Sequence, residues 1–143
     1  MFDSPVKAVM RRRNLLKASP ATSVKEAAAM MAKKNTGAVM VMDNGRLVGI
    51  FTERDAVFRV IARGLDAATT PLGEVMTPAP RVVDPNKPYG YALAIMHENG
   101  FRHLPVLENG KVVGIVSARS AMDPDMEEFA SEAQRRRHYQ EIG

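Results

Sequence analysis

The sequence predicts an α+β fold in which two β-α-β-β-α repeats pack about a pseudo-twofold axis. The first observation is an internal repeat: residues 41–56 align without a gap on residues 106–121, and eight of the sixteen positions are identical. The second is an Asn-Gly pair between two β-rich runs in each copy, which is typical of a hairpin. Units this short bury too little apolar surface alone, so we expect one shared module.

Each copy opens on a short segment that contains a proline. SPVKAVM, beginning at Ser4, matches TPLGEVM, beginning at Thr70, and in both a hydroxyl residue precedes the proline. Ser and Thr favour the N-cap of a helix, and proline favours its first position. We therefore expect short helices at these points, a first repeat over residues 4–69 and a second over residues 70–122.

The first repeat then shows a helix, a hairpin and a second helix. Ser23 and Glu26 are spaced as a capping box before VKEAAAMMAKK, a run of strong helix formers. Residues 43–45, Asp-Asn-Gly, join the strands AVMVM and RLVGIF. A further helix is expected over residues 53–63, with one apolar face made by Val57, Val60 and Ile61.

The second repeat follows the same order but ends differently. We expect its helix over residues 89–98 and its hairpin turn at residues 108–110. Pro124 stands where the first copy has Arg59, and proline does not continue a helix. A new helix is expected from Pro124 to about Glu141, capped by Asp123, within an extension over residues 123–143.

This tandem resembles the CBS-domain pair (cystathionine-beta-synthase-type domains). The resemblance is carried by Gly-hydrophobic-x-Ser/Thr-x-x-Asp in the first copy, by GEVMTPAP and by FRHLPVLENGKVVGIVS, and it covers residues 4–122. It implies a stand-alone regulatory module that senses AMP, ADP, ATP or a related adenosyl ligand between the repeats and acts on a separate protein. The alternatives are a dimerising scaffold that does not bind nucleotides and, less favoured, a nucleic-acid-binding module.

Thr52 and Asp55 are the strongest candidates for ligand contact. They stand three residues apart where a strand meets a helix, so both side chains can reach one cleft. A carboxylate can accept hydrogen bonds from both cis hydroxyls of a ribose, and helix N–H groups favour an anion. The alternative is that the two residues only cap the helix.

The resemblance implies the other contacts of this cleft. A basic pair before the LPV strand, Arg102 and His103, would face the first motif and hold phosphate, with Arg54 beside it. Adenine would lie near residues that begin or precede strands of the second copy, Arg81, Val82 and Phe101. Phe101 can instead belong to the core, and Arg102 can instead pair with a surface acid.

A second, weaker cleft is expected by pseudosymmetry. It would combine Ser117 and Ser120 with residues of the first copy, Thr36, Gly37 and Ala38. Ser120 replaces the carboxylate of Asp55 with one neutral hydroxyl, and Gly37 and Ala38 stand where the other cleft has Arg102 and His103. We therefore expect one occupied nucleotide site.

Composition narrows the remaining classes of function. The net charge is +4 and the pI about 9.6, but the arginine triplets at residues 11–13 and 135–137 lack interleaved aromatics. Cysteine is absent, the three histidines share no ligand spacing, and no Gly-x-Ser-x-Gly elbow surrounds a serine. We expect no enzyme, metal or cofactor, a cytoplasmic protein, and a homodimer formed through apolar helix faces with the C-terminal helix docked.

Overall fold

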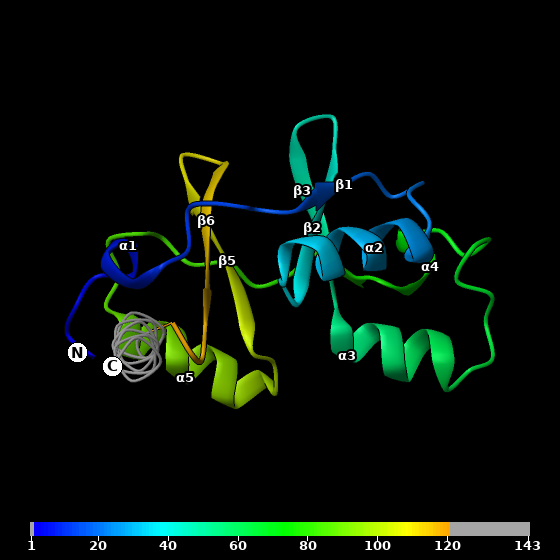
Figure 1. The fold of residues 1–143 in the computed structure, drawn as a ribbon. Helices are drawn as coiled ribbons and strands as arrows, with labels where there is room; N and C mark the ends of the chain where they lie inside the picture. Colours follow the sequence, from blue (N-terminus) through cyan, green and yellow to red (C-terminus); the bar gives the residue numbers. More distant parts are fainter. Residues whose placement is uncertain (1, 121–143) are drawn as a thin grey trace, which may run out of the picture.

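The computed structural model describes residues 2–120, and these form an α+β fold of two similar halves (Figure 1). One half holds a four-stranded sheet in the order β1-β2-β3-β4, and the other a two-stranded sheet of β5 and β6. The predicted C-terminal helix and the extension over residues 123–143 lie outside the described residues.

The elements alternate as the repeat predicts. The helical segments are α1 (Val6–Val9), α2 (Val24–Lys34), α3 (Glu53–Asp55) continued by the π-helix η1 (Ala56–Ile61), α4 (Leu72–Val75) and α5 (Tyr89–Asn99). The strands are β1 (Lys17–Ala18), β2 (Ala38–Asp43), β3 (Arg46–Thr52), β4 (Thr77–Pro78), β5 (His103–Glu108) and β6 (Lys111–Ser117).

Both hairpins turn where the Asn-Gly pairs predict. Asn44 and Gly45 have φ of 52° and 77°, and Asn109 and Gly110 have the same pair of values. Positive φ at both central residues is the type I′ geometry whose twist matches the flanking strands. The two antiparallel registers are also equivalent, since Val41 pairs with Gly49 and Val106 with Gly114.

The helix beginnings are confirmed in part. Ser23 caps α2 by accepting a hydrogen bond of 3.1 Å from the N–H of Glu26. The expected caps at Ser4 and Thr70 are wrong by one residue, because Pro5 and Pro71 occupy the N-cap positions with extended backbones. The Thr70 hydroxyl instead donates 2.7 Å to the carbonyl of Asp66.

The opening segments are exchanged between the halves. The N–H of Val6 in α1 donates to the carbonyl of Lys87 at 2.8 Å, and that of Leu72 in α4 donates to the carbonyl of Thr22 at 2.8 Å. Val6 is accordingly buried in the core of the second half, with Tyr89, Leu104 and Val116, whereas Leu72 and Val75 are buried in the core of the first. Each half is therefore completed by a segment that belongs in sequence to the other.

A small apolar cluster joins the halves at their centre. Ala38 and Ile50 of the first sheet contact Ile115 of the second, with Leu15 packed beside them. Arg11 also pairs with Ile115 through two backbone hydrogen bonds of 2.8 and 3.1 Å. The chain then runs from α1 to β1 across the front of both halves (Figure 1).

The helix after β3 differs from the prediction in its winding and its buried face. Hydrogen bonds from Ala62 to Val57 and from Leu65 to Val60 span five residues, so η1 is wider than an α-helix. Of the expected apolar face only Val60 is buried, at 2% exposure, while Val57 is 49% and Ile61 71% exposed. The wider turn breaks the 3.6-residue period on which that face was predicted.

Two glycines make room for the exchanged segments. A Cβ at Gly49 would collide with the sulfur of Met76, and a Cβ at Gly114 would lie 2.7 Å from the sulfur of Met10 and 2.9 Å from the carbonyl oxygen of Arg11. Met10 and Met76 are equivalent residues of the two opening segments. The Gly-Ile pair of each copy is thus a contact between one repeat and the opening of the other.

We expect Gly114→Ala to lower the free energy of unfolding by about 1–3 kcal/mol, as overpacking of a filled core does. Gly49→Ala should cost less, because its methyl group meets a flexible methionine side chain and not a backbone carbonyl. Urea unfolding of the two variants measures the difference. Equal losses would contradict the distinction between backbone and side-chain contact.

Candidate functional site

A cleft of about 1150 Å3 lies between the repeats. Its walls come from the opening segment, the end of α2 and start of β2, the start of β5 and the end of β6. The lining residues of chemical interest are Arg11, Lys34, Asn35, Thr36, Gly37, Glu53, Arg102, His103, Ser117, Arg119 and Ser120.

The backbone fixes the residues of this cleft. Arg11 is held by its pairing with Ile115, and the N–H of Ala118 donates 3.1 Å to the carbonyl of Arg102, which ties the end of β6 to the start of β5. The N–H of Glu53 donates 3.1 Å to the carbonyl of Gly37 and so places the start of α3 beside β2. The cleft thus has a rigid frame with long side chains on its rim.

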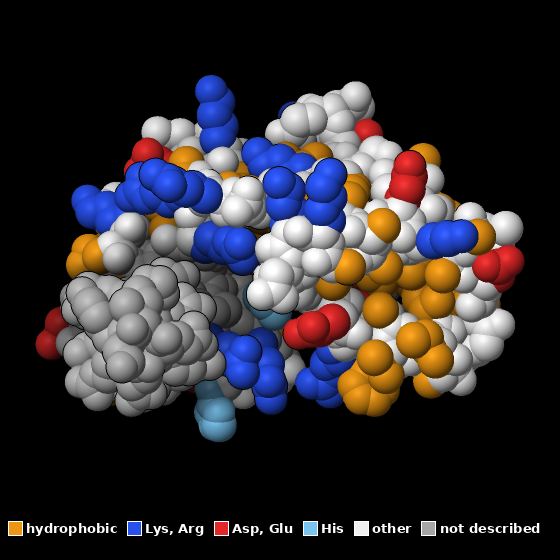
Figure 2. Space-filling model, viewed as in Figure 1, with side chains coloured by type: hydrophobic (Ala, Val, Ile, Leu, Met, Phe, Trp, Pro, Cys, Tyr) orange, Lys and Arg blue, Asp and Glu red, His pale blue; other side chains and the backbone are white. Residues whose placement is uncertain are grey.

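The cleft is strongly basic. Arg11, Lys34, Arg102 and Arg119 contribute four positive charges, and Glu53 is the one carboxylate among its lining residues. Figure 2 shows Lys and Arg side chains gathered over the N-terminal segment and the middle of this face. Because cations gathered around a hollow raise the local concentration of anions, the arrangement suits a phosphorylated ligand.

His103 lies in the wall at the start of β5. Burial lowers the pKa of His103 below its ordinary value of 6.5; the carboxylate of Glu53 acts in the opposite direction and the guanidinium of Arg102 in the same direction. The imidazole is therefore kept neutral at physiological pH and offers one donor and one acceptor. An anion in the cleft would favour its protonated form.

Ser117 and Ser120 close the end of β6 as a local turn. The hydroxyl of Ser120 accepts a 2.7 Å hydrogen bond from the N–H of Ser117, and the Ser117 hydroxyl accepts 3.2 Å from the N–H of Arg119. Their two hydroxyl oxygens are 3.2 Å apart. Both lie in the cleft with Thr36, Gly37 and Ala38, as the sequence predicts for the cleft it marks as weaker.

Thr52 and Asp55 form a capping box and do not line the cleft. One oxygen of Asp55 accepts from the N–H of Thr52 at 2.9 Å and from its hydroxyl at 3.2 Å, while Nε of Arg59 lies 3.5 Å from the other oxygen. Asp55 is 8% exposed. The structure shows the two residues in a capping role, in which they satisfy free N–H groups at the start of the helix.

The remaining candidates of the first motif's cleft are also placed elsewhere. Arg54 donates 3.3 Å to the carbonyl of Gly100 and lies 5.2 Å over the ring of Phe58. Phe101 packs against the core of the second half, which is the alternative expected for it. Arg81 and Val82 are exposed and do not line the cleft.

The structure therefore corrects the cleft to which Arg102 and His103 were assigned. Arg102 and His103 line the same cleft as Ser117 and Ser120, whereas Asp55 does not line it. The expectation that Arg102 and His103 belong to a different cleft from Ser117 and Ser120 is wrong for this structure. The pair lies in the wall of a cleft that residues of both halves line.

Sequence reasoning missed Arg11, Lys34, Arg119 and Glu53. Arg11 belongs to an arginine triplet that was not assigned to a cleft, and only the exchange of opening segments brings it there. A signal existed for Arg119, because the repeat places it opposite Arg54. Lys34 and Glu53 carry no signal beyond lying next to motif residues.

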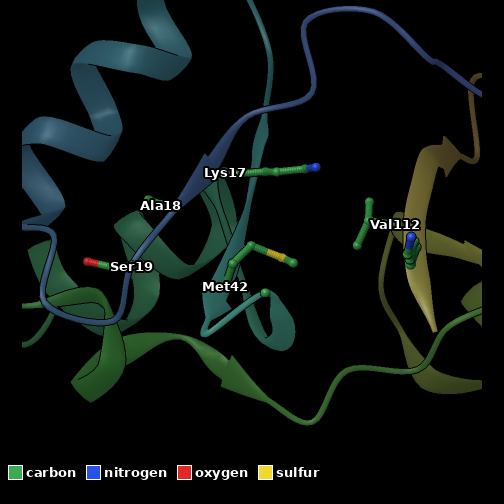
Figure 3. Close-up of a pocket in the computed structure, with 7 residues that line it drawn as sticks. Lys17, Ala18, Ser19, Met42 and Val112 are labelled. Carbon is green, nitrogen blue, oxygen red and sulfur yellow. The ribbon is translucent and has the colours of Figure 1, made fainter.

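A second, more open groove of about 600 Å3 lies between the hairpins. It is lined by Lys17, Ala18, Ser19, Met42, Gly45, Lys111 and Val112 (Figure 3). Lys17 and Met42 extend from the first half toward the side on which Val112 lies (Figure 3). Its polar groups do not converge, since the hydroxyl of Ser19 and the amine of Lys17 point in opposite directions (Figure 3).

Residues 2–120 hold neither a metal-binding cluster nor a helix that could span a membrane. Within that range no group of three His, Asp or Glu side chains is placed to hold a metal ion. No described helix is long and apolar enough to cross a bilayer.

We expect acidification to weaken the fold partly through His103. The unfolded chain takes up a proton at the ordinary pKa of 6.5, whereas the folded chain takes it up only at lower pH. Unfolding therefore binds protons in this window, and stability falls from about pH 7 toward pH 5. Urea unfolding of His103→Asn should show a shallower decline, with His97→Asn on the exposed face of α5 as the control. A full decline in His103→Asn would contradict this origin.

Comparison with known proteins agrees with this architecture. The family model described as CBS domain matches residues 6–62 and 72–124. A conserved protein of Pyrococcus horikoshii has a crystal structure with TM-score 0.80 and 33% identity, covering 87% of this chain and 94% of that one. The CBS domain protein PAE2072 of Pyrobaculum aerophilum, complexed with AMP, has TM-score 0.74 and 25% identity, covering 82% and 89%.

A curated relative is much longer than this chain. The Meiotically up-regulated gene 70 protein of Schizosaccharomyces pombe is 41% identical over 97 residues, which are 67% of this chain and 13% of that protein. The two family matches together span most of the sequence, and each coincides with one copy of the internal repeat. The chain belongs to the CBS-domain family as a tandem pair.

Proposed function

We propose that this CBS pair is a regulatory module that binds an adenosine-containing nucleotide in the cleft between the repeats and acts on a separate protein. The observation that carries the proposal is the cluster of Arg11, Lys34, Arg102 and Arg119 around one hollow of nucleotide size. The relative complexed with AMP supports the choice of ligand.

Arg102 is the residue that we assign first to phosphate. Its guanidinium offers a rigid fork of donors, and His103 beside it supplies a further donor. The carboxylate of Asp55 is engaged by Thr52 and Arg59 and does not line this cleft, so we assign it no ligand contact here.

Self-association is the second part of the proposal. Val57, Phe58 and Ile61 of η1 are 49%, 59% and 71% exposed, and Figure 2 shows hydrophobic side chains gathered over this helix. Exposed apolar patches of this kind mark interaction surfaces. We propose that two copies associate through this face. The same association is expected in the scaffold alternative, in which the dimer binds no nucleotide.

We expect ATP, ADP or AMP to stabilise the protein against heat. A ligand at 100 times its Kd adds about 2.7 kcal/mol to the free energy of unfolding. Arg102→Ala should weaken binding about 10- to 100-fold, because a hydrogen bond to a charged group contributes about 1.5–3 kcal/mol. Thermal shift and calorimetric titration measure both effects.

Arg46→Ala, at the exposed hairpin tip, is the matched control for loss of one arginine. The absence of any shift with adenosyl ligands would favour the scaffold alternative. Tight binding of DNA or RNA that falls steeply with salt would favour the nucleic-acid alternative.

We expect Ile61→Glu to convert the dimer to a monomer without unfolding it. A buried glutamate without a partner at an interface is unfavourable, whereas at this exposed position it does not disturb the core. Light scattering gives the mass, and Val82→Glu on another surface is the control. A monomeric wild type, or a dimeric Ile61→Glu variant, would contradict the assignment.

A further inference from the structure

The carboxylate of Glu53 is unexpected in a cleft that is otherwise basic. Its oxygens belong to the one acidic side chain among the lining residues, opposite four cations. A carboxylate repels phosphate, so in a site for bare anions it would weaken binding. The same carboxylate strengthens binding if the ligand brings a hydrogen-bond donor to it.

Glu53 is placed for this role by its backbone and by a glycine. Its N–H donates to the carbonyl of Gly37 at 3.1 Å, which places the backbone of Glu53 beside the start of β2 at the cleft wall. One carboxylate oxygen lies 2.9 Å from the position that a Cβ on Gly37 would take, so the side chain crosses over the glycine. Any other residue at position 37 would compete for that space.

The acceptor oxygens of Glu53 are available. Among the described residues the ion pair within 4 Å is that of Asp55 with Arg59, and Glu53 makes no side-chain hydrogen bond there. Its charge acts on His103 in the same wall. The structure thus holds Asp55 in a cap but leaves Glu53 with four open lone-pair positions.

We infer that Glu53 is a specificity-determining residue that selects anions carrying hydroxyl or amine donors and discriminates against bare polyphosphates. The inference rests on the proposed function, because it concerns the same cleft. The cations bind the phosphate end of the ligand, and Glu53 accepts from its ribose hydroxyls or exocyclic amine. A nucleotide satisfies both ends, whereas inorganic triphosphate satisfies only the first.

Glu53→Gln distinguishes attraction of a hydrogen-bond donor from repulsion of phosphate when the binding of ATP and of inorganic triphosphate is compared. We expect ATP to bind about tenfold more weakly, since a charge-assisted hydrogen bond is lost, and inorganic triphosphate to bind severalfold more tightly, since a like charge is removed. 2′,3′-Dideoxy-ATP identifies the donor. If it binds wild type as weakly as ATP binds Glu53→Gln, the ribose supplies the donor; if it binds as ATP does, the base amine does.

Gly37→Ala tests the geometry without removing the charge. Its methyl group should push the carboxylate aside, because the atom that it meets is the end of a flexible side chain. ATP affinity should fall while triphosphate affinity does not rise. Glu74→Gln, exposed in α4 and outside the cleft, controls for net charge and should change neither affinity by more than about twofold.

Calorimetric titration of the full chain gives the outcomes. Opposite changes for the two ligands in Glu53→Gln support the inference. Tighter binding of both ligands, or no change in either, overturns it while the proposed function stands. Failure of wild type to bind any nucleotide overturns both, and circular dichroism with thermal unfolding verifies that each variant is folded.

Discussion

The architecture depends on the packing of each opening segment against a glycine in a strand of the other repeat. Met10 and Arg11 approach Gly114 closely enough that a methyl group there would meet the Arg11 carbonyl at 2.9 Å. Hydrogen bonds from Val6 and Leu72 attach the same segments to the opposite halves. The cleft follows from this exchange, since it places a basic residue of the first copy beside the last strand of the second.

Local signals predicted the elements, and the exchange could not be predicted from them. Asn44-Gly45 and Ser23 act within a few residues, so their outcome is readable from spacing alone. The partner of Val6 is decided by burial at a distance of some eighty residues, for which the repeat offers two equivalent cores. Because the segments SPVKAVM and TPLGEVM are alike, nothing in either specifies its own half or the other.

The candidate site was predicted by residue type more accurately than by grouping. Arg102, His103, Ser117 and Ser120 are all in the cleft, but Asp55 is not. The sequence does not decide between a carboxylate that caps a helix and one that holds a sugar, because both uses need it three residues after a hydroxyl. The π-helical turn makes the role of Asp55 harder to predict. Arg59, which lies in this turn, donates 3.0 Å to the carbonyl of Met76 and also pairs with Asp55.

The exchange of opening segments also sets the order in which the two repeats can pack during synthesis. Residues 6–9 are synthesised before Tyr89 and Val116, yet they are buried against a surface that includes both. The first repeat, in turn, is closed only when Leu72 and Val75 have been added. Domains generally fold as units from the N-terminus. Here each repeat is completed by a segment of the other, so residues 6–9 cannot be buried until the strand that contains Val116 has been made.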